Sequence, residues 1–213
     1  GSCIGMIKHE AHEIMGVDDP RLHDVSVRSF DFCEFLMEEY RNGEIDLSEL
    51  KPLDLTVPYH QPCQVKSQGM GFPAVQLMEL IPGVKVLESN EPCCGIAGTY
   101  GLKAERYDVS QKIGAKVFEH MREYNEGVGV CDTETCRWQI QKGSGVRTVH
   151  PVWVLHAAYG LSRLPGIEVD DPDGRMTTPV WRERPVEGSG SDGAQDAPAA
   201  SGGCSGSCAC GGH

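Results

Sequence analysis

The stretch LDLTVPYHQPC, residues 53–63, joins a short apolar run to a cysteine. Residues 53–59 read as a β-strand, and the same order of an apolar run followed by cysteine returns at 84–94 and at 128–136. A fourth apolar run lies at 147–149. Helical patterns alternate with these four runs and cover residues 73–81, 107–124, 134–142 and 151–159. This alternation predicts an α/β fold with a parallel sheet, right-handed crossovers and flanking helices.

The N-terminal segment resembles the end of a second copy of this unit. Residues 27–36 (VRSFDFCEFL) align without gaps with residues 146–155 (VRTVHPVWVL), and Cys3 opens a helical stretch much as Cys136 does. Internal duplication accounts for this match better than chance similarity. We therefore predict a tandem repeat whose first copy is truncated just before Cys3.

Three parts follow from this pattern. Residues 1–50 are the remnant of the first copy, 51–165 are the complete copy, and 166–213 are an acidic linker and a tail rich in Gly, Ser and Cys. A tail of this composition cannot bury a core, so disorder is expected. Its thiols and imidazole either form a zinc or copper site or remain free; they are Cys204, Cys208, Cys210 and His213.

Composition excludes several classes of partner. The net charge of −12 disfavours nucleic acid and anionic lipid. No apolar run has the roughly 18–20 residues that cross a bilayer, so membrane association is expected to be peripheral or through a partner. Ten cysteines without an export signal indicate metal or redox chemistry rather than a disulfide framework.

Cysteines follow three of the predicted strands. They are Cys63, the pair Cys93 and Cys94, Cys131, and Cys136 five residues later. The carboxyl ends of parallel strands meet at one edge of a sheet, so these thiols are expected to converge there. Convergent thiolates are what an iron–sulfur cluster requires. A position at a helix start is expected to lower the pKa of Cys136, and Gly95, Gly98 and Gly101 to let backbone N–H groups approach the sulfurs.

Two other uses of these thiols stay open. Four thiolates also suit structural zinc, although zinc sites usually draw on short C-x-x-C pairs. Cys93 and Cys94 could form a vicinal disulfide, which adjacent residues make with strain. His60 and His150 either serve the cluster or satisfy backbone at a strand end. Cys33 is expected to be a small buried apolar residue, and Trp138 and Trp153 to pack in a core.

The pattern of cysteines resembles that of a known family. The pattern of Cys63, Cys93-Cys94-Gly95 and Cys136 is similar to the CCG cysteine-rich domain of the heterodisulfide reductase B subunits and of glycolate oxidase iron–sulfur subunits. More narrowly, three segments resemble the C subunits of anaerobic glycerol-3-phosphate dehydrogenases: PCCGIAGTYGLK (92–103), DTETCRWQI (132–140) and GFPAVQLMELIPG (71–83).

The resemblance implies an electron-transfer subunit with a [4Fe–4S] cluster, in some relatives a non-cubane one. Its implied partners are flavin-containing dehydrogenase subunits that oxidise glycerol 3-phosphate and membrane quinone or a quinone-linked partner. The implied location is cytoplasmic, at the inner face of the cell membrane. By position the ligand candidates are Cys63, Cys93, Cys94 and Cys136, with Cys3 answering to Cys136 in the truncated copy. A thiol–disulfide catalytic subunit and a zinc-bound interaction module remain alternatives.

The sequence departs from the family pattern in two places. Thr133 stands where the family's C-x-x-C has its first cysteine, and Cys131 lies two residues earlier. We expect Cys131 to take over the missing ligand. In addition, the ferredoxin-like C-x-x-C-x-x-C-x-x-x-C-P runs of the glycerol-3-phosphate type do not occur in this sequence.

Overall fold

The computed structural model describes residues 1–164, and the predicted tail site at Cys204–His213 lies outside them. Four parallel strands form one sheet in the order β2-β1-β3-β4. The register pairs Leu55 with Val84 and Tyr59 with both Glu88 and Val130. The strands are β1 (Leu55–Tyr59), β2 (Val84–Glu88), β3 (Gly129–Val130) and β4 (Thr148–Val149).

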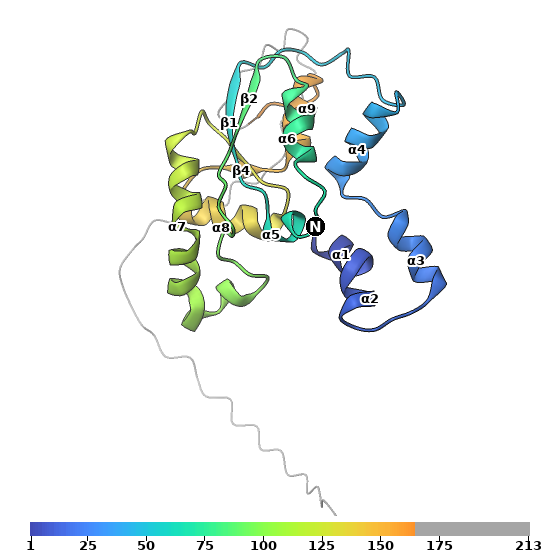
Figure 1. Cartoon of the computed structure of the whole chain (residues 1–213). Helices are drawn as coiled ribbons and strands as arrows, with labels where there is room; N and C mark the ends of the chain where they lie inside the picture. The colour runs from blue at the N-terminus through green and yellow to red at the C-terminus, as the bar shows by residue number, and fades with distance from the viewer. Residues whose placement is uncertain (165–213) are drawn as a thin grey trace, which may run out of the picture. The chain divides into compact units, whose positions relative to one another are not determined.

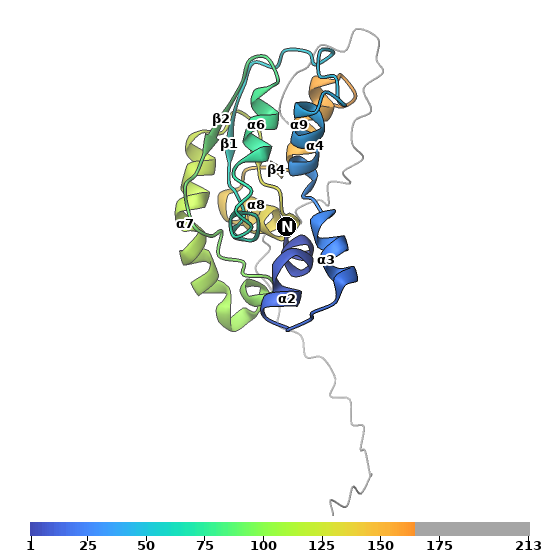
Figure 2. The same cartoon turned by 45° about the vertical axis from the view of Figure 1, so that its right-hand side comes forward.

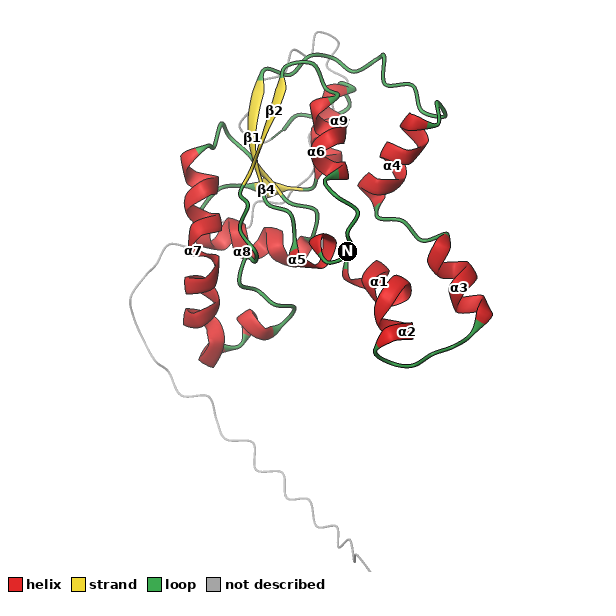
Figure 3. Cartoon of the chain, viewed as in Figure 1, coloured by secondary structure: helices red, strands yellow, loops and turns green. Residues whose placement is uncertain are grey.

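Helices precede and follow every strand (Figure 3). Before the sheet come α1 (Ser2–Gly5), the π-helix η1 (Met6–Glu10), α2 (Ala11–Glu13), α3 (Pro20–Val27) and α4 (Phe32–Arg41). Between and after the strands come α5 (Cys63–Lys66), α6 (Pro73–Glu79), the 3₁₀ turns η2 (Tyr100–Leu102) and η3 (Ala104–Arg106), α7 (Tyr107–Glu123), α8 (Glu134–Ser144) and α9 (Pro151–Ala158).

The sheet separates two apolar cores. α6 and α9 lie on one side of β1 and β2, and α7 lies on the other side (Figures 1 and 2). The larger core joins the strands to α4, α6 and α9, and includes Val57, Leu77 and Val154. The smaller core lies between α7 and α8 and contains Cys94, Cys131 and Cys136 among apolar side chains. Three of the cysteines are therefore part of the smaller core, and Cys33 is part of the larger one.

The predicted α/β fold with a parallel sheet and flanking helices is confirmed, and each expected strand and helix of residues 53–159 is present. The boundaries differ by one or two residues, and the difference at α8, expected to end at residue 142, has a structural reason. α8 continues through Gly143 to Ser144, and Gly145 ends it with a φ of 75°. Gly143 is needed for packing, because a Cβ there would lie 2.3 Å from the Phe118 ring. It is not a helix stop.

The predicted duplication stays a prediction. The aligned residues Asp31 and His150 both cap a helix, since the Asp31 side chain accepts from Cys33 N and the His150 ring accepts from Val152 N. Ser29 and Phe30, which align with β4, are in no strand. In the described part of the chain, no helix is long and apolar enough to span a membrane.

Candidate metal centre

Five cysteine side chains come together beyond the carboxyl ends of the strands. Cys63 begins α5, Cys93 and Cys94 follow β2, Cys131 follows β3, and Cys136 lies in the first turn of α8. The Cys63 and Cys94 thiols are hydrogen-bonded to the Cys93 sulfur. Cys94 is also in contact with Cys136, and Cys136 with Cys131. The sulfurs thus form one continuous group, as expected from the parallel topology.

One cysteine of this group has a lowered pKa. The pKa of Cys93 is strongly lowered, because Cys63 and Cys94 donate hydrogen bonds to its sulfur and Gly95 N donates another at 3.2 Å. The neighbouring thiols shift in the opposite direction: the pKa of Cys63 is raised chiefly by the hydrogen bond to Cys93, and that of Cys94 chiefly by its bond to Cys136. Negative charge in this group is therefore held first on Cys93.

The expected lowering of the Cys136 pKa is wrong for the metal-free chain. The pKa of Cys136 is raised, first because its thiol is hydrogen-bonded to Cys131 and further by burial. These effects outweigh the helix start, which contributes only about 0.3–1 kcal/mol at exposed positions. The vicinal disulfide is not formed either, since Cys93 and Cys94 are both free thiols.

Exposure differs across the group. Cys63 and Cys93 are partly exposed, whereas Cys94, Cys131 and Cys136 are buried. Cys131 has a relative exposure of 0% and lies beside Cys136 in the smaller core. Cys3 is exposed on α1, and α1 packs against α5, the helix that Cys63 begins.

The two polar residues singled out near the cysteines differ in their surroundings. His60 follows β1, is fully buried, and interacts electrostatically with Cys93. Its Nε2 atom is buried and has no hydrogen-bond partner within the described chain. Thr133, at the family's usual cysteine position, precedes α8 and also has a buried, unpartnered Oγ1.

The comparisons with known proteins agree with this arrangement. Residues 57–141 match the family model of the CCG cysteine-rich domain. The chain therefore contains a CCG cysteine-rich domain over these residues. The matched segment of the CCG domain begins within β1 and ends within α8, so it contains all five clustered cysteines.

Among curated proteins, the chain is similar to the C subunit of anaerobic glycerol-3-phosphate dehydrogenase from Escherichia coli (strain K12). Identity is 36% over 157 residues, which are 74% of this chain and 38% of that protein. The B subunit of fumarate reductase (CoM/CoB) from Methanothermobacter marburgensis is 28% identical over 151 residues, 67% of this chain and 29% of that one.

A third relative is an uncharacterized iron–sulfur protein from Methanococcus maripaludis. It is 34% identical over 76 residues, 34% of this chain and 15% of that protein. The chain therefore spans well under half the length of all three relatives. No solved structure matches significantly.

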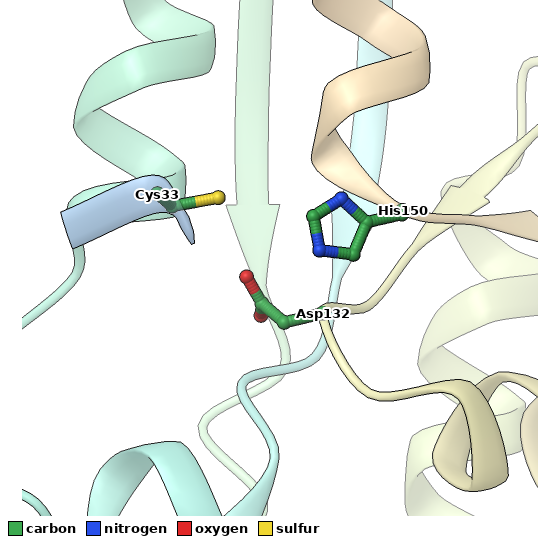
Figure 4. Close-up of side chains that lie close together, drawn as sticks. All are labelled: Cys33, Asp132 and His150. Carbon is green, nitrogen blue, oxygen red and sulfur yellow. The ribbon is translucent and has the colours of Figure 1, made fainter. Parts of the chain in front are cut away.

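A second polar group lies beside the cysteines of the CCG domain. Cys33 of α4, Asp132 and His150 point toward one another (Figure 4), and their potential ligand atoms all lie within 4.8 Å of one another. The Tyr59 hydroxyl donates to Asp132 Oδ2 at 2.6 Å, and the Cys33 thiol donates to the same carboxylate. The prediction that Cys33 is buried is confirmed, but its thiol also has this polar role.

This second group is a hydrogen-bonded cluster of side chains and not a metal site. His150 Nδ1 accepts the Val152 N–H at 3.1 Å, so the proton of the neutral ring is on Nε2. Figure 4 shows the Nε2 side of the ring facing Asp132. A neutral histidine that binds a metal through Nε2 carries its proton on Nδ1. Nδ1 could then no longer accept the Val152 N–H. His150 thus satisfies backbone at a strand end.

We expect Asp132→Asn to remove a pH dependence of stability. Burial raises the pKa of Asp132 from 3.8 to about 6. The folded chain then binds more protons than the unfolded chain between those values, so the free energy of unfolding falls as pH rises through this window, by up to roughly 3 kcal/mol.

Denaturant unfolding of the iron-free chain from pH 4 to 7 measures this slope. The slope should flatten in Asp132→Asn and persist in Asp24→Asn, whose side chain is exposed. Equal slopes in wild type and Asp132→Asn would contradict the assignment.

Sequence reasoning missed three residues and misplaced one. Tyr59, Ser89 and Asp132 have polar contacts beside the cysteines, and the only available signal was their position at strand ends. The prediction for Trp138 is wrong: it is 57% exposed, because Cys136, Gln139 and Ile140 define the buried face of α8. Trp153 packs against the larger core, as predicted.

Proposed function

We propose that this CCG domain holds an iron–sulfur cluster and transfers electrons as part of a larger oxidoreductase. The observation that carries the proposal is the contact of five cysteine sulfurs at the carboxyl edge of the sheet. The proposed ligands are Cys63, Cys93, Cys94, Cys131 and Cys136. When bound, such a cluster supplies one-electron transfer.

The residues present fit this group. Several sulfurs converge on one small volume, and the Gly95 N–H already donates to the Cys93 sulfur, as backbone groups do around iron–sulfur clusters. The His60 Nε2 atom is buried without a partner beside Cys93. Structural zinc usually draws on short-spaced C-x-x-C pairs, and these five cysteines offer none, which makes the zinc module the weaker alternative.

Cys131 is included because its side chain is in contact with Cys136 rather than facing away from the cysteines. Thr133 is a poor ligand for a soft metal site, since its hydroxyl lacks a thiolate's affinity for iron. We propose that Cys131 replaces the missing cysteine of the family's C-x-x-C. Cys3, which answers to Cys136 in the truncated first copy, stays a further cofactor-binding candidate, since α1 packs against α5.

The relatives suggest the setting of the electron transfer. One is named as part of a glycerol-3-phosphate dehydrogenase and another as part of a fumarate reductase. We propose a [4Fe–4S] cluster, cubane or non-cubane, that takes electrons from flavin-containing dehydrogenase subunits and passes them toward quinone at the inner face of the cell membrane.

One observation favours a second function. Cys93 is partly exposed and its pKa is lowered by hydrogen bonds from Cys63 and Cys94, which favours the thiolate, the form of cysteine that attacks disulfides. A heterodisulfide reductase-like catalytic role would use this atom. Anaerobic turnover of a disulfide substrate by the cluster-loaded chain, without any partner subunit, would select that role over electron transfer alone.

We expect the chain purified without oxygen to contain iron and acid-labile sulfide in comparable amounts. The reason is that several convergent thiolates bind iron–sulfur clusters, and metal binding deprotonates the thiols that are protonated without it. Colorimetric iron and sulfide analysis with zinc determined in parallel is the measurement. Stoichiometric zinc with no iron would refute the proposed function.

A further inference from the structure

His60 is held rigidly at the cysteine-bearing edge of the sheet. It follows the last residue of β1, its backbone N–H donates to Val130 O at 3.0 Å, and its relative exposure is 0%. These contacts fix the backbone of His60 at the ends of β1 and β3, and the ring is bonded to Ser89, which follows β2. Its electrostatic interaction with Cys93 shows that it lies beside the sulfurs.

The neighbours of His60 indicate where its proton lies. Nδ1 is 2.9 Å from Ser89 Oγ. Ser89 Oγ already accepts the Glu91 N–H at 3.4 Å, and its own hydroxyl hydrogen needs an acceptor. His60 Nδ1 supplies that acceptor, which leaves the proton of the neutral ring on Nε2.

The Nε2 atom then has an unmet hydrogen bond. It is buried and has no partner among the described residues, the cysteine sulfurs included. A buried donor without an acceptor costs about 1–3 kcal/mol, so such a group calls for an explanation. An acceptor that is present only when the site is filled provides one.

We propose that His60 donates its Nε2–H to a sulfur of the bound cluster on the Cys93 side and thereby raises the reduction potential of the cluster. The inference rests on the proposed function. Reduction adds negative charge to the cluster, and a hydrogen bond to sulfur stabilises the more negative state. His60 is thus a positioning and tuning residue and does not ligate iron.

The test compares His60→Leu with His156→Leu in chains loaded with cluster. His156 is a suitable control because it is also a histidine bonded to a serine, with Nδ1 2.7 Å from Ser162 Oγ, but it lies on α9. Histidine is labelled with ¹⁵N, and the paramagnetic cluster is examined by pulsed EPR for nitrogen coupling. The midpoint potential is measured by redox titration.

We expect a weak histidine nitrogen coupling in the wild type and in His156→Leu that disappears in His60→Leu, together with a shift of the midpoint potential to more negative values in His60→Leu alone. An unchanged coupling and potential in His60→Leu would overturn the inference and leave the proposed function intact. A strong coupling typical of a bonded nitrogen would overturn the donor role in favour of ligation.

If His60→Leu does not assemble a cluster, the labelled wild type decides alone: no histidine coupling overturns the inference. A wild-type chain that binds no iron overturns the proposed function and the inference together, and iron analysis shows this before any spectrum is recorded.

Discussion

Cys93→Ser and Cys94→Ser are each expected to lose the cluster or to bind it in a rearranged form, with iron content reduced roughly tenfold or more. Cys93 accepts hydrogen bonds from two neighbouring thiols and one backbone N–H, and Cys94 joins it to Cys136. Either change therefore interrupts the group of sulfurs at its centre. Iron analysis and the visible and EPR spectra of the anaerobic protein measure the effect.

Cys33→Ser is the matched control, because Cys33 is also a buried cysteine but contacts Asp132 instead of the cysteine group. Its cluster spectrum is expected to match the wild type. Equal loss of cluster in all three variants would show that the division of the cysteines into cluster ligands and non-ligands is wrong.

Gly95→Ala is expected to destabilise the fold by about 3 kcal/mol or more. Gly95 has a φ of 91°, and a Cβ there would lie 2.1 Å from the backbone oxygen of Ser110. The obstacle is helix backbone, which cannot move aside as a flexible side chain can. The same shift would disturb the Gly95 N–H that donates to Cys93, so cluster binding should fall as well.

Gly98→Ala separates strain from crowding. Gly98 also has a positive φ, 66°, but no atom lies within 4 Å of its ideal Cβ position. Only the left-handed backbone then opposes the substitution, at about 1–2 kcal/mol. Denaturant unfolding compares the two variants, and similar losses in both would contradict the role assigned to the close approach of Ser110.

Much of the fold could be predicted from sequence because its signals are local. Apolar runs, helix-starting prolines at Pro73 and Pro151, and helical spacing in α7 depend on neighbouring residues alone. The convergence of the cysteines followed from topology, since parallel strands place their carboxyl ends together. The boundary of α8 could not be predicted, because Gly143 is explained by the distant ring of Phe118.

Details of the site depend on contacts between distant segments. The raised pKa of Cys136 depends on Cys131 and burial, and the raised pKa of Asp132 on burial between α4 and the sheet. Neither is visible in the local sequence. Trp138 was wrongly predicted to be buried for the same reason: packing against α7 and the cysteines determines which face of α8 is buried.

The uneven burial of the cysteines gives a bound cluster two unlike sides. Cys94, Cys131 and Cys136 close one side with the apolar residues of the smaller core, whereas Cys63 and Cys93 are reached by solvent. Molecular oxygen and small oxidants would arrive first at the Cys63 and Cys93 side, so sulfur oxidation should begin on these two residues. A redox partner that docked over Cys63 and Cys93 would also come closest to such a cluster, so electron exchange and oxygen sensitivity would share one face of the domain.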